Sequence, residues 1–127
     1  ISKLIEVNVF KANSKKQAKK IAFSIAESLL VKTAIFGKDA NWGRVIMAIG
    51  KTTQKININK ISLKFGKLII AEKGKISKKI NNDKLRKYMK NKIIKINLDL
   101  QNGKYNKTVW SSDLTNEYIR INADYRS

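Results

Sequence analysis

The sequence predicts a mixed α/β (α+β) domain in which most strands pair in antiparallel fashion. Residues 4–11 and 94–101 alternate apolar and polar side chains with a period of two, which is typical of half-buried strands. Residues 15–30 instead repeat apolar side chains at helical spacing. Asn102-Gly103 predicts a hairpin turn, because both central residues of that turn need a positive φ. We therefore expect strands and helices in a chain of 127 residues, the size of a single domain or a fragment of one.

The N-terminal residues predict a strand followed by a long helix. The strand spans residues 4–11, with its apolar side chains on one side. Ser14 and Gln17 match a capping box, in which serine and glutamine side chains each bond a backbone amide at the start of a helix. The helix is expected to run from Lys15 to Leu30. Its apolar stripe consists of Ala18, Ile21, Ala22, Ile25, Ala26 and Leu29.

Residues 31–50 predict a short apolar segment, a loop and a second helix. The loop is expected at residues 37–44, which contain two glycines. Either Asp39 or Asn41 can cap the helix that follows, which ends near Gly50. The residues of this helix expected to face the core are Val45, Ile46 and Ile49.

The second half of the chain predicts short strands, a short helix and the hairpin. Residues 56–71 are read as strands broken at Gly66, and Asn82-Asp83 can cap a short helix. The returning strand of the hairpin spans residues 104–110, and a last helix is expected toward Ile121.

The chain is strongly basic, with 28 Lys and Arg against 9 Asp and Glu, a net charge of +19. Such a charge is typical of proteins that bind nucleic acid or an anionic membrane surface. However, 24 of the cations are lysines and only 4 are arginines, although arginine is the better reader of phosphates and bases. Lys, Ile and Asn are all encoded by A/T-rich codons, so a biased genome also accounts for the lysines. A small basic nucleic-acid-binding module therefore stays open as an alternative function.

The residue types that are missing exclude several kinds of chemistry. The chain has no cysteine and no histidine. Thiol nucleophiles, thiolate or histidine metal sites and a Ser-His-Asp triad are therefore excluded, and we expect no metal and no cofactor. No apolar stretch approaches the length that crosses a bilayer, and no signal segment opens the chain, so we expect a cytoplasmic location.

Two segments contain residue types that the predicted helices and strands do not explain. Residues 30–44 (LVKTAIFGKDANWGR) gather glycine, tryptophan, arginine and capping-type side chains in an expected loop. On physical grounds alone, Trp42 could fill the core while Asp39 and Asn41 cap a helix. Residues 110–127 (WSSDLTNEYIRINADYRS) stay rich in aromatic, charged and amide side chains, which indicates a docked terminus. Considered individually, Asn122 could instead cap the C-terminal end of a helix, and Ser127 could be an exposed terminal residue.

These two segments resemble the signature blocks of the ornithine acetyltransferase family, the bifunctional glutamate N-acetyltransferases of arginine biosynthesis. The family wording is close to LVKTAxFGxDPNWGR and TAWTCDLTxxYVxINADYRT/S, and the resemblance covers essentially the whole chain. Departures are few: Ala40 replaces a proline, Lys38 occupies a variable position, and Ser111-Ser112 stand where Thr-Cys is common. The resemblance implies that the chain is the C-terminal part of the family's β chain and part of a layered αββα sandwich.

The resemblance also implies a function. Family enzymes cleave themselves before a threonine, which then carries the acetyl group from N-acetylornithine to glutamate; some relatives also accept acetyl-CoA. That threonine is expected upstream of this chain, so no catalytic residue is assigned here. An asparagine and the final hydroxyl residue of the family contact substrate, which points to Asn122 and Ser127. Asp39, Asn41, Trp42 and Arg44 are expected to support the site.

The expected partners are the upstream α chain, the remainder of the β chain and the substrates N-acetylornithine and glutamate. We expect an oligomer that does not associate with a membrane. A non-catalytic interaction scaffold derived from the enzyme is a third possible function. The strands also argue against the nucleic-acid-binding alternative, because they carry Lys, Asn and Asp rather than interleaved aromatics and arginines.

Overall fold

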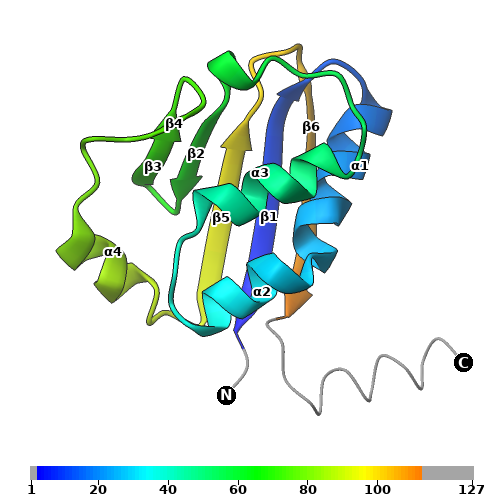
Figure 1. Cartoon of the computed structure of the whole chain (residues 1–127). Coiled ribbons are helices and arrows are strands. Elements are labelled where there is room, and N and C mark those ends of the chain that lie inside the picture. Colours follow the sequence, from blue (N-terminus) through cyan, green and yellow to red (C-terminus); the bar gives the residue numbers. More distant parts are fainter. Residues whose placement is uncertain (1–2, 113–127) are drawn as a thin grey trace, which may run out of the picture.

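A computed structural model describes residues 3–112 as one six-stranded sheet with helices (Figure 1). The strand order is β4-β3-β2-β5-β1-β6. The strands are β1 (Leu4–Ala12), β2 (Ser62–Phe65), β3 (Leu68–Glu72), β4 (Lys75–Ile76), β5 (Ile93–Asp99) and β6 (Tyr105–Ser112). The helices are α1 (Lys15–Glu27), α2 (Leu29–Phe36), α3 (Trp42–Gly50) and α4 (Asn82–Tyr88), with a 3₁₀ turn at Ile58–Lys60. The predicted mixed α+β fold is confirmed.

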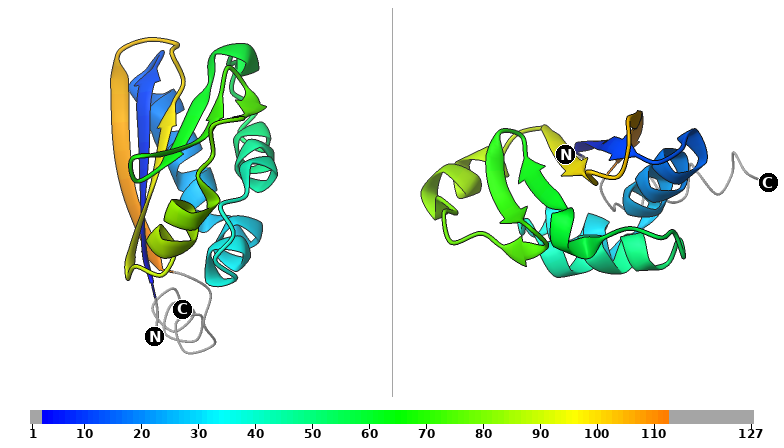
Figure 2. Two further views of the ribbon diagram at one scale, coloured as in Figure 1. Left: turned by 90° about the vertical axis from the view of Figure 1, so that its left-hand side faces the viewer. Right: turned by 90° about the horizontal axis from the view of Figure 1, so that it is seen from above.

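Most of the sheet is antiparallel, as predicted. The β1–β6, β2–β3, β2–β5 and β3–β4 pairs are antiparallel, whereas β1 and β5 run parallel. α1, α2 and α3 all lie on one face of the sheet (Figure 2). The described residues therefore form one β layer and one α layer, as expected for part of a layered sandwich.

The core lies between these two layers. Alternation places Ile5, Val7 and Val9 of β1 toward the helices, where each is at most 1% exposed. The neighbouring strand β5 adds a parallel row, in which Val7 stands beside Ile96. The inward residues of α1 complete the core: Gln17, Ala18, Ile21, Ala22, Ile25 and Ala26 are all buried. The predicted strand and the predicted apolar stripe are confirmed, except that Leu29 of the stripe is 62% exposed.

The expected continuous helix over residues 15–30 is wrong, because Ser28 ends it. Ser28 has an extended backbone, and its side-chain oxygen accepts a hydrogen bond from the Val31 backbone amide at 3.2 Å. A serine in this conformation is a helix N-cap. It closes α1 after Glu27 and starts α2, so the apolar segment 31–36 is also helical.

The capping box at Ser14 is present in modified form. The Ser14 hydroxyl accepts from the Gln17 backbone amide at 3.0 Å, as predicted. The Gln17 side chain accepts from the backbone amide of Asn13 rather than that of Ser14, at 2.9 Å. Gln17 is 1% exposed and also bonds the Lys55 carbonyl and the Asn102 side chain. One residue therefore ties the start of α1 to two loops.

The predicted hairpin between β5 and β6 is wrong, since β1 lies between these strands. The connection instead crosses the end of β1, where the Asn102 backbone amide donates to the Lys11 backbone carbonyl at 2.8 Å. The residue with positive φ is Gln101, at 45°, not Asn102 or Gly103. Gly103 is needed for close approach: a β-carbon there would lie 2.4 Å from the Ala12 carbonyl oxygen.

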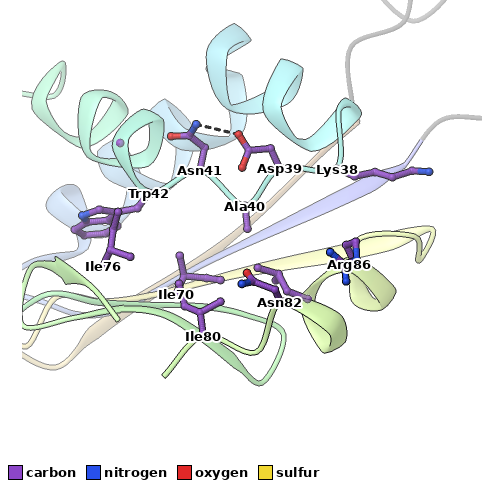
Figure 3. A pocket seen from close by; sticks show the side chains of 12 residues that line it. Lys38, Asp39, Ala40, Asn41, Trp42, Ile70, Ile76, Ile80, Asn82 and Arg86 are labelled. Atoms are coloured by element: carbon purple, nitrogen blue, oxygen red, sulfur yellow. Dashed lines mark hydrogen bonds between the residues drawn. The ribbon is translucent and has the colours of Figure 1, made fainter. Parts of the chain in front are cut away.

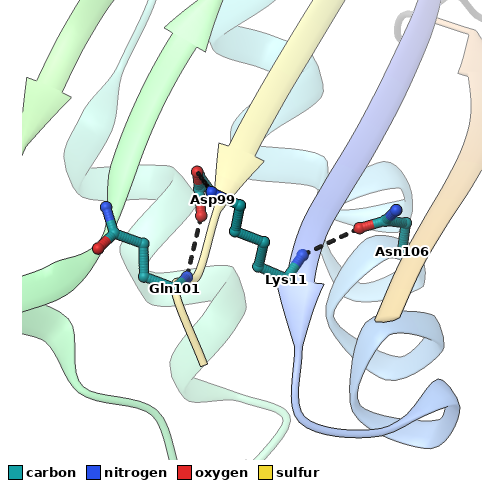
Figure 4. Close-up of polar contacts among 4 residues, drawn as sticks. All are labelled: Lys11, Asp99, Gln101 and Asn106. Atoms are coloured by element: carbon teal, nitrogen blue, oxygen red, sulfur yellow. Dashed lines mark hydrogen bonds and ion pairs between the residues drawn. The ribbon is translucent and has the colours of Figure 1, made fainter. Parts of the chain in front are cut away.

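Polar contacts hold this crossing in place (Figure 4). The Gln101 backbone amide donates to the Asp99 carboxylate at 2.9 Å, which stabilises the tight turn. The Lys11 amide donates to the Asn106 side chain at 3.0 Å, and the Lys11 ammonium lies 3.5 Å from Asp99. The three strand ends are thereby joined at one corner of the sheet.

The remaining elements agree with the predictions in kind. Short strands follow residue 61, with a turn at Gly66, and α4 is capped by Asn81, one residue before the predicted Asn82-Asp83. Among residues 3–112, no helix has the length and apolar character needed to span a membrane. The last helix predicted toward Ile121, and with it Asn122 and Ser127, lies outside the described residues.

Candidate functional site

The connection between α2 and α3 is a closely bonded loop. The backbone amides of Gly37, Lys38 and Asp39 donate to carbonyls of the last turns of α2 at 2.8–3.0 Å. Lys38 adopts the left-handed conformation, with φ of 61°. These bonds satisfy carbonyls that the end of a helix leaves unpaired, so the loop has a defined shape. It is shorter than predicted, because Trp42 already begins α3.

Asn41 organises the polar side chains of this loop. Its side-chain oxygen accepts a hydrogen bond from the Arg44 backbone amide at 3.0 Å. Asn41 is therefore the N-cap of α3, one of the two alternatives that the sequence predicted. Its amide nitrogen donates to the Asp39 carboxylate, also at 3.0 Å. Arg44 reaches back, and its guanidinium donates to the Leu30 carbonyl at 2.8 Å. The three side chains therefore fix α3 against the start of α2.

A cleft of about 480 Å³ lies beneath this loop, between it and the segment formed by β3, β4 and α4. Figure 3 shows Ala40 pointing into the cleft and Trp42 lying beside Ile76. The apolar lining includes Ile70, Ile76, Ile80 and Leu85, and the polar lining consists of Lys38, Asp39, Asn41, Asn82 and Arg86. The sequence-predicted loop thus forms one wall of a cavity.

The lining of this cleft carries groups that can bind a charged ligand. Its described residues supply one carboxylate, two cations and two amides, and none of them has a hydroxyl or thiol side chain. Such groups can pair with the charged ends of a zwitterion. Within residues 3–112, no group of His, Cys, Asp and Glu side chains could hold a metal ion.

The structure brings together part of the predicted site. Asp39, Asn41 and Trp42 line the cleft. Arg44 does not line it and instead donates a hydrogen bond to the Leu30 carbonyl. Trp42 is half-buried and packs against the core, so its predicted role as a core plug is also met. Asn122 and Ser127 lie outside the described residues.

Sequence reasoning missed the opposite wall. Asn82 and Arg86 come from α4, and Ile70 and Ile76 from β3 and β4. No local pattern in residues 70–86 indicates a cavity, because the packing of this segment against the loop creates it.

The chain is similar to known proteins along almost its whole length. A family model described as the ArgJ family matches residues 1–127. The arginine biosynthesis bifunctional protein ArgJ of Caulobacter vibrioides is 45% identical over 126 residues, which cover 99% of this chain and 31% of that protein. The protein of the same name from Bartonella henselae is 48% identical over 124 residues, covering 98% and 30%.

A solved structure shares the fold. The crystal structure of arginine biosynthesis bifunctional protein ArgJ from Bacillus halodurans superposes with a TM-score of 0.86 at 38% identity. The match covers 97% of this chain and 58% of that one. The chain spans about 30% of the length of the curated relatives it matches. Since the family model matches it from residue 1 to residue 127, the chain belongs to the ArgJ family.

Proposed function

We propose that this chain is the C-terminal part of an acetyltransferase that moves an acetyl group from N-acetylornithine to glutamate in arginine biosynthesis. The observation that carries the proposal is the similarity to ArgJ proteins at 45% identity over 99% of the chain. The name of these relatives, arginine biosynthesis bifunctional protein, supports the pathway. The nucleic-acid-binding alternative has no support among these relatives.

The proposed reaction needs a nucleophile that this chain does not supply. A threonine upstream, freed by self-cleavage, attacks the acetyl carbonyl of N-acetylornithine, and its hydroxyl proton passes to its own α-amine. The carbon–nitrogen bond breaks, ornithine leaves with that proton, and an acetyl-threonine ester remains. The amine of glutamate then attacks the ester and restores the threonine hydroxyl. In the proposed bifunctional enzyme acetyl-CoA can acetylate the same threonine, with cleavage of the carbon–sulfur bond and release of CoA as the thiol.

In this scheme the chain binds and positions substrate. Asn122 and Ser127 are proposed to contact the amino-acid part of the ligand, because an amide both donates and accepts and a hydroxyl does likewise. Hydrogen bonds of Asp39 and Asn41 hold the loop beside the cleft in one conformation, and Trp42 packs against the core. The proposed partners are the upstream α chain and the rest of the β chain, in an oligomer located in the cytoplasm.

The first test is an acetyl-transfer assay from N-acetylornithine to glutamate. The 127-residue chain alone should stay at background, because the nucleophile is absent from it. Activity should return when the chain is reconstituted with the upstream part of the enzyme. Turnover by the pure chain would contradict the assigned division of roles.

The second test concerns the substrate contacts in the reconstituted enzyme. Asn122→Ala removes one hydrogen-bonding side chain, which costs roughly 0.5–1.5 kcal/mol for a neutral partner and more for a charged one. We expect kcat/KM for N-acetylornithine to fall by about twofold to tenfold, and deletion of Ser127 to act similarly. Asn116→Ala is the matched control, since it removes an asparagine from the same segment. Equal kinetics for all three variants and the wild type would exclude Asn122 and Ser127 as substrate contacts.

A further inference from the structure

A second cavity lies on the face of the sheet opposite α1–α3. Its volume is about 860 Å³, larger than that of the cleft beneath the loop. Its floor consists of Glu6 and Asn8 of β1 and Lys95 and Asn97 of β5, and its sides come from the β2–β3 turn and from α4. We call it the open-face groove. α4 contributes to both cavities, with Leu85 lining the first and Lys84 the second.

The floor of the open-face groove is a fixed belt of hydrogen bonds. The Asn97 amide donates to the Gly66 carbonyl at 2.9 Å, and the Asn8 amide donates to the Asn97 side-chain oxygen at 2.8 Å. Thr108 in turn donates to the Asn8 oxygen at 2.7 Å. These bonds cross β5, β1 and β6 and orient both amides, so the floor is polar and preorganised.

The one carboxylate in the groove is already engaged. The two Glu6 oxygens accept hydrogen bonds from Asn8 at 2.9 Å and Trp110 at 3.1 Å. The Asn8 hydrogen bond, with smaller help from Trp110 and the Lys95 charge, lowers the pKa of Glu6 against the opposing effect of burial. Glu6 is therefore an anion at neutral pH, and Lys95 stands beside it in the register of β1 and β5.

Three further cations have no acidic partner in the part of the chain that the structure describes. Lys67, Lys84 and Lys87 line the groove, and none of them lies within ion-pairing distance of a carboxylate among residues 3–112. All three are exposed at the rim. A concave surface that collects cations in this way raises the local concentration of anions.

Tyr88 forms part of the wall of the open-face groove with its aromatic ring and its hydroxyl group. Its ring lies against Gly66, where a β-carbon would come within 2.7 Å of it, and its hydroxyl accepts from the Lys95 backbone amide at 2.8 Å. Burial raises the pKa of Tyr88 above its ordinary value of 10.0, so the hydroxyl keeps a proton that it can donate. Leu68 and Ile93 extend the apolar wall.

We propose that the open-face groove binds a small organic phosphate with an aromatic body, of the nucleoside diphosphate class. The phosphates would lie against Lys67, Lys84 and Lys87, because several cations together match a group with more than one negative charge. The aromatic body would lie against Tyr88, Leu68 and Ile93. The open-face groove and the cleft beneath the α2–α3 loop have different lining residues, and this proposal does not depend on the proposed acetyl transfer.

The test measures binding of ADP to the 127-residue chain by calorimetry and by ¹H–¹⁵N chemical shifts. We expect shifts concentrated at the residues that line the open-face groove. Lys84→Ala/Lys87→Ala should weaken binding about tenfold, the effect of losing two phosphate contacts. Lys16→Ala/Lys19→Ala is the matched control: it removes two exposed lysines with the same spacing from α1, on the other side of the sheet, and should leave the affinity within about twofold.

Several results would overturn the proposal. Equal weakening by the two double variants would mean that ADP responds only to the overall charge. Pyrophosphate that binds as tightly as ADP would exclude the aromatic wall from recognition. An acidic peptide that competes with ADP and has a lower Kd than ADP would identify a protein partner instead. No binding at about 10 mM ADP would exclude the site. Lys67→Ala provides an independent variant, and circular dichroism of each variant checks that the fold is kept.

Discussion

Gly103→Ala tests whether the chain crosses over the end of β1 as described. A β-carbon at residue 103 would lie 2.4 Å from the Ala12 carbonyl oxygen and 2.8 Å from the Asn13 α-carbon. Both neighbours are backbone atoms at the start of the connection to α1, so neither can turn away as a side chain would. Overpacking of this kind costs about 1–3 kcal/mol of stability.

Gly50→Ala is the matched control, because it makes the same change where space is free. Apart from its chain neighbours and the backbone of its own helix, no atom lies within 4 Å of a β-carbon at Gly50, the last residue of α3. Alanine loses less conformational entropy than glycine in a helix, so this variant should gain about 0.4–1 kcal/mol. The two alanine variants should therefore move the free energy of unfolding in opposite directions.

Urea unfolding followed by circular dichroism measures both changes. With a slope of about 1–3 kcal/mol per molar urea, a loss of about 2 kcal/mol lowers the midpoint by about 1 M. A Gly103→Ala chain that unfolds at the wild-type midpoint or above it would refute the close approach, and with it the path of the connection between β5 and β6.

Three other predictions concern buried, charged and exposed side chains. Gln17→Ala should cost about 1–3 kcal/mol in the same urea assay, because it leaves the Lys55 carbonyl and other buried groups unpaired; a neutral result would contradict the tie that we describe. Glu6 has a folded-state pKa below its ordinary value of 4.5, so its stabilising effect is complete above that value and is lost as the pH falls through the lowered pKa. The stability difference between wild type and Glu6→Gln should therefore shrink in acid, and a constant difference would argue against an ionised Glu6. Leu29 and Phe36 are 62% and 59% exposed, so light scattering should detect self-association that Leu29→Ser/Phe36→Ser reduces, and a clean monomer at high concentration would contradict it.

The elements that the sequence predicted well are those in which one face alone is buried. β1 and β5 alternate because helices cover only one side of the sheet, and that period is visible in residues 4–11 and 94–101. The α1–α2 boundary was missed because the apolar side chains continue through Ser28, and only the backbone conformation shows that this serine caps a new helix.

The errors of topology have a different origin. Asn102-Gly103 is a local turn signal, but the insertion of β1 between β5 and β6 is decided by pairing between residues about 90–100 positions apart, as between Asn8 and both Asn97 and Thr108. The candidate site divides in the same way. Its loop, with Asp39, Asn41 and Trp42, stands out in the sequence, whereas the wall from α4 exists only after packing.

The position of β1 in the sheet also sets the order in which the chain can fold. Leu4 pairs with Ile93 on one side and with Ser112 on the other, so both neighbours of this strand are synthesised long after it. Until then Ile5, Val7 and Val9 have α1 to pack against but no strand partner. Closing such long loops is slow, and it leaves an apolar strand edge open to other chains in the meantime. Folding on the ribosome should therefore be late and cooperative, with aggregation as the competing outcome while β5 and β6 are still within the exit tunnel.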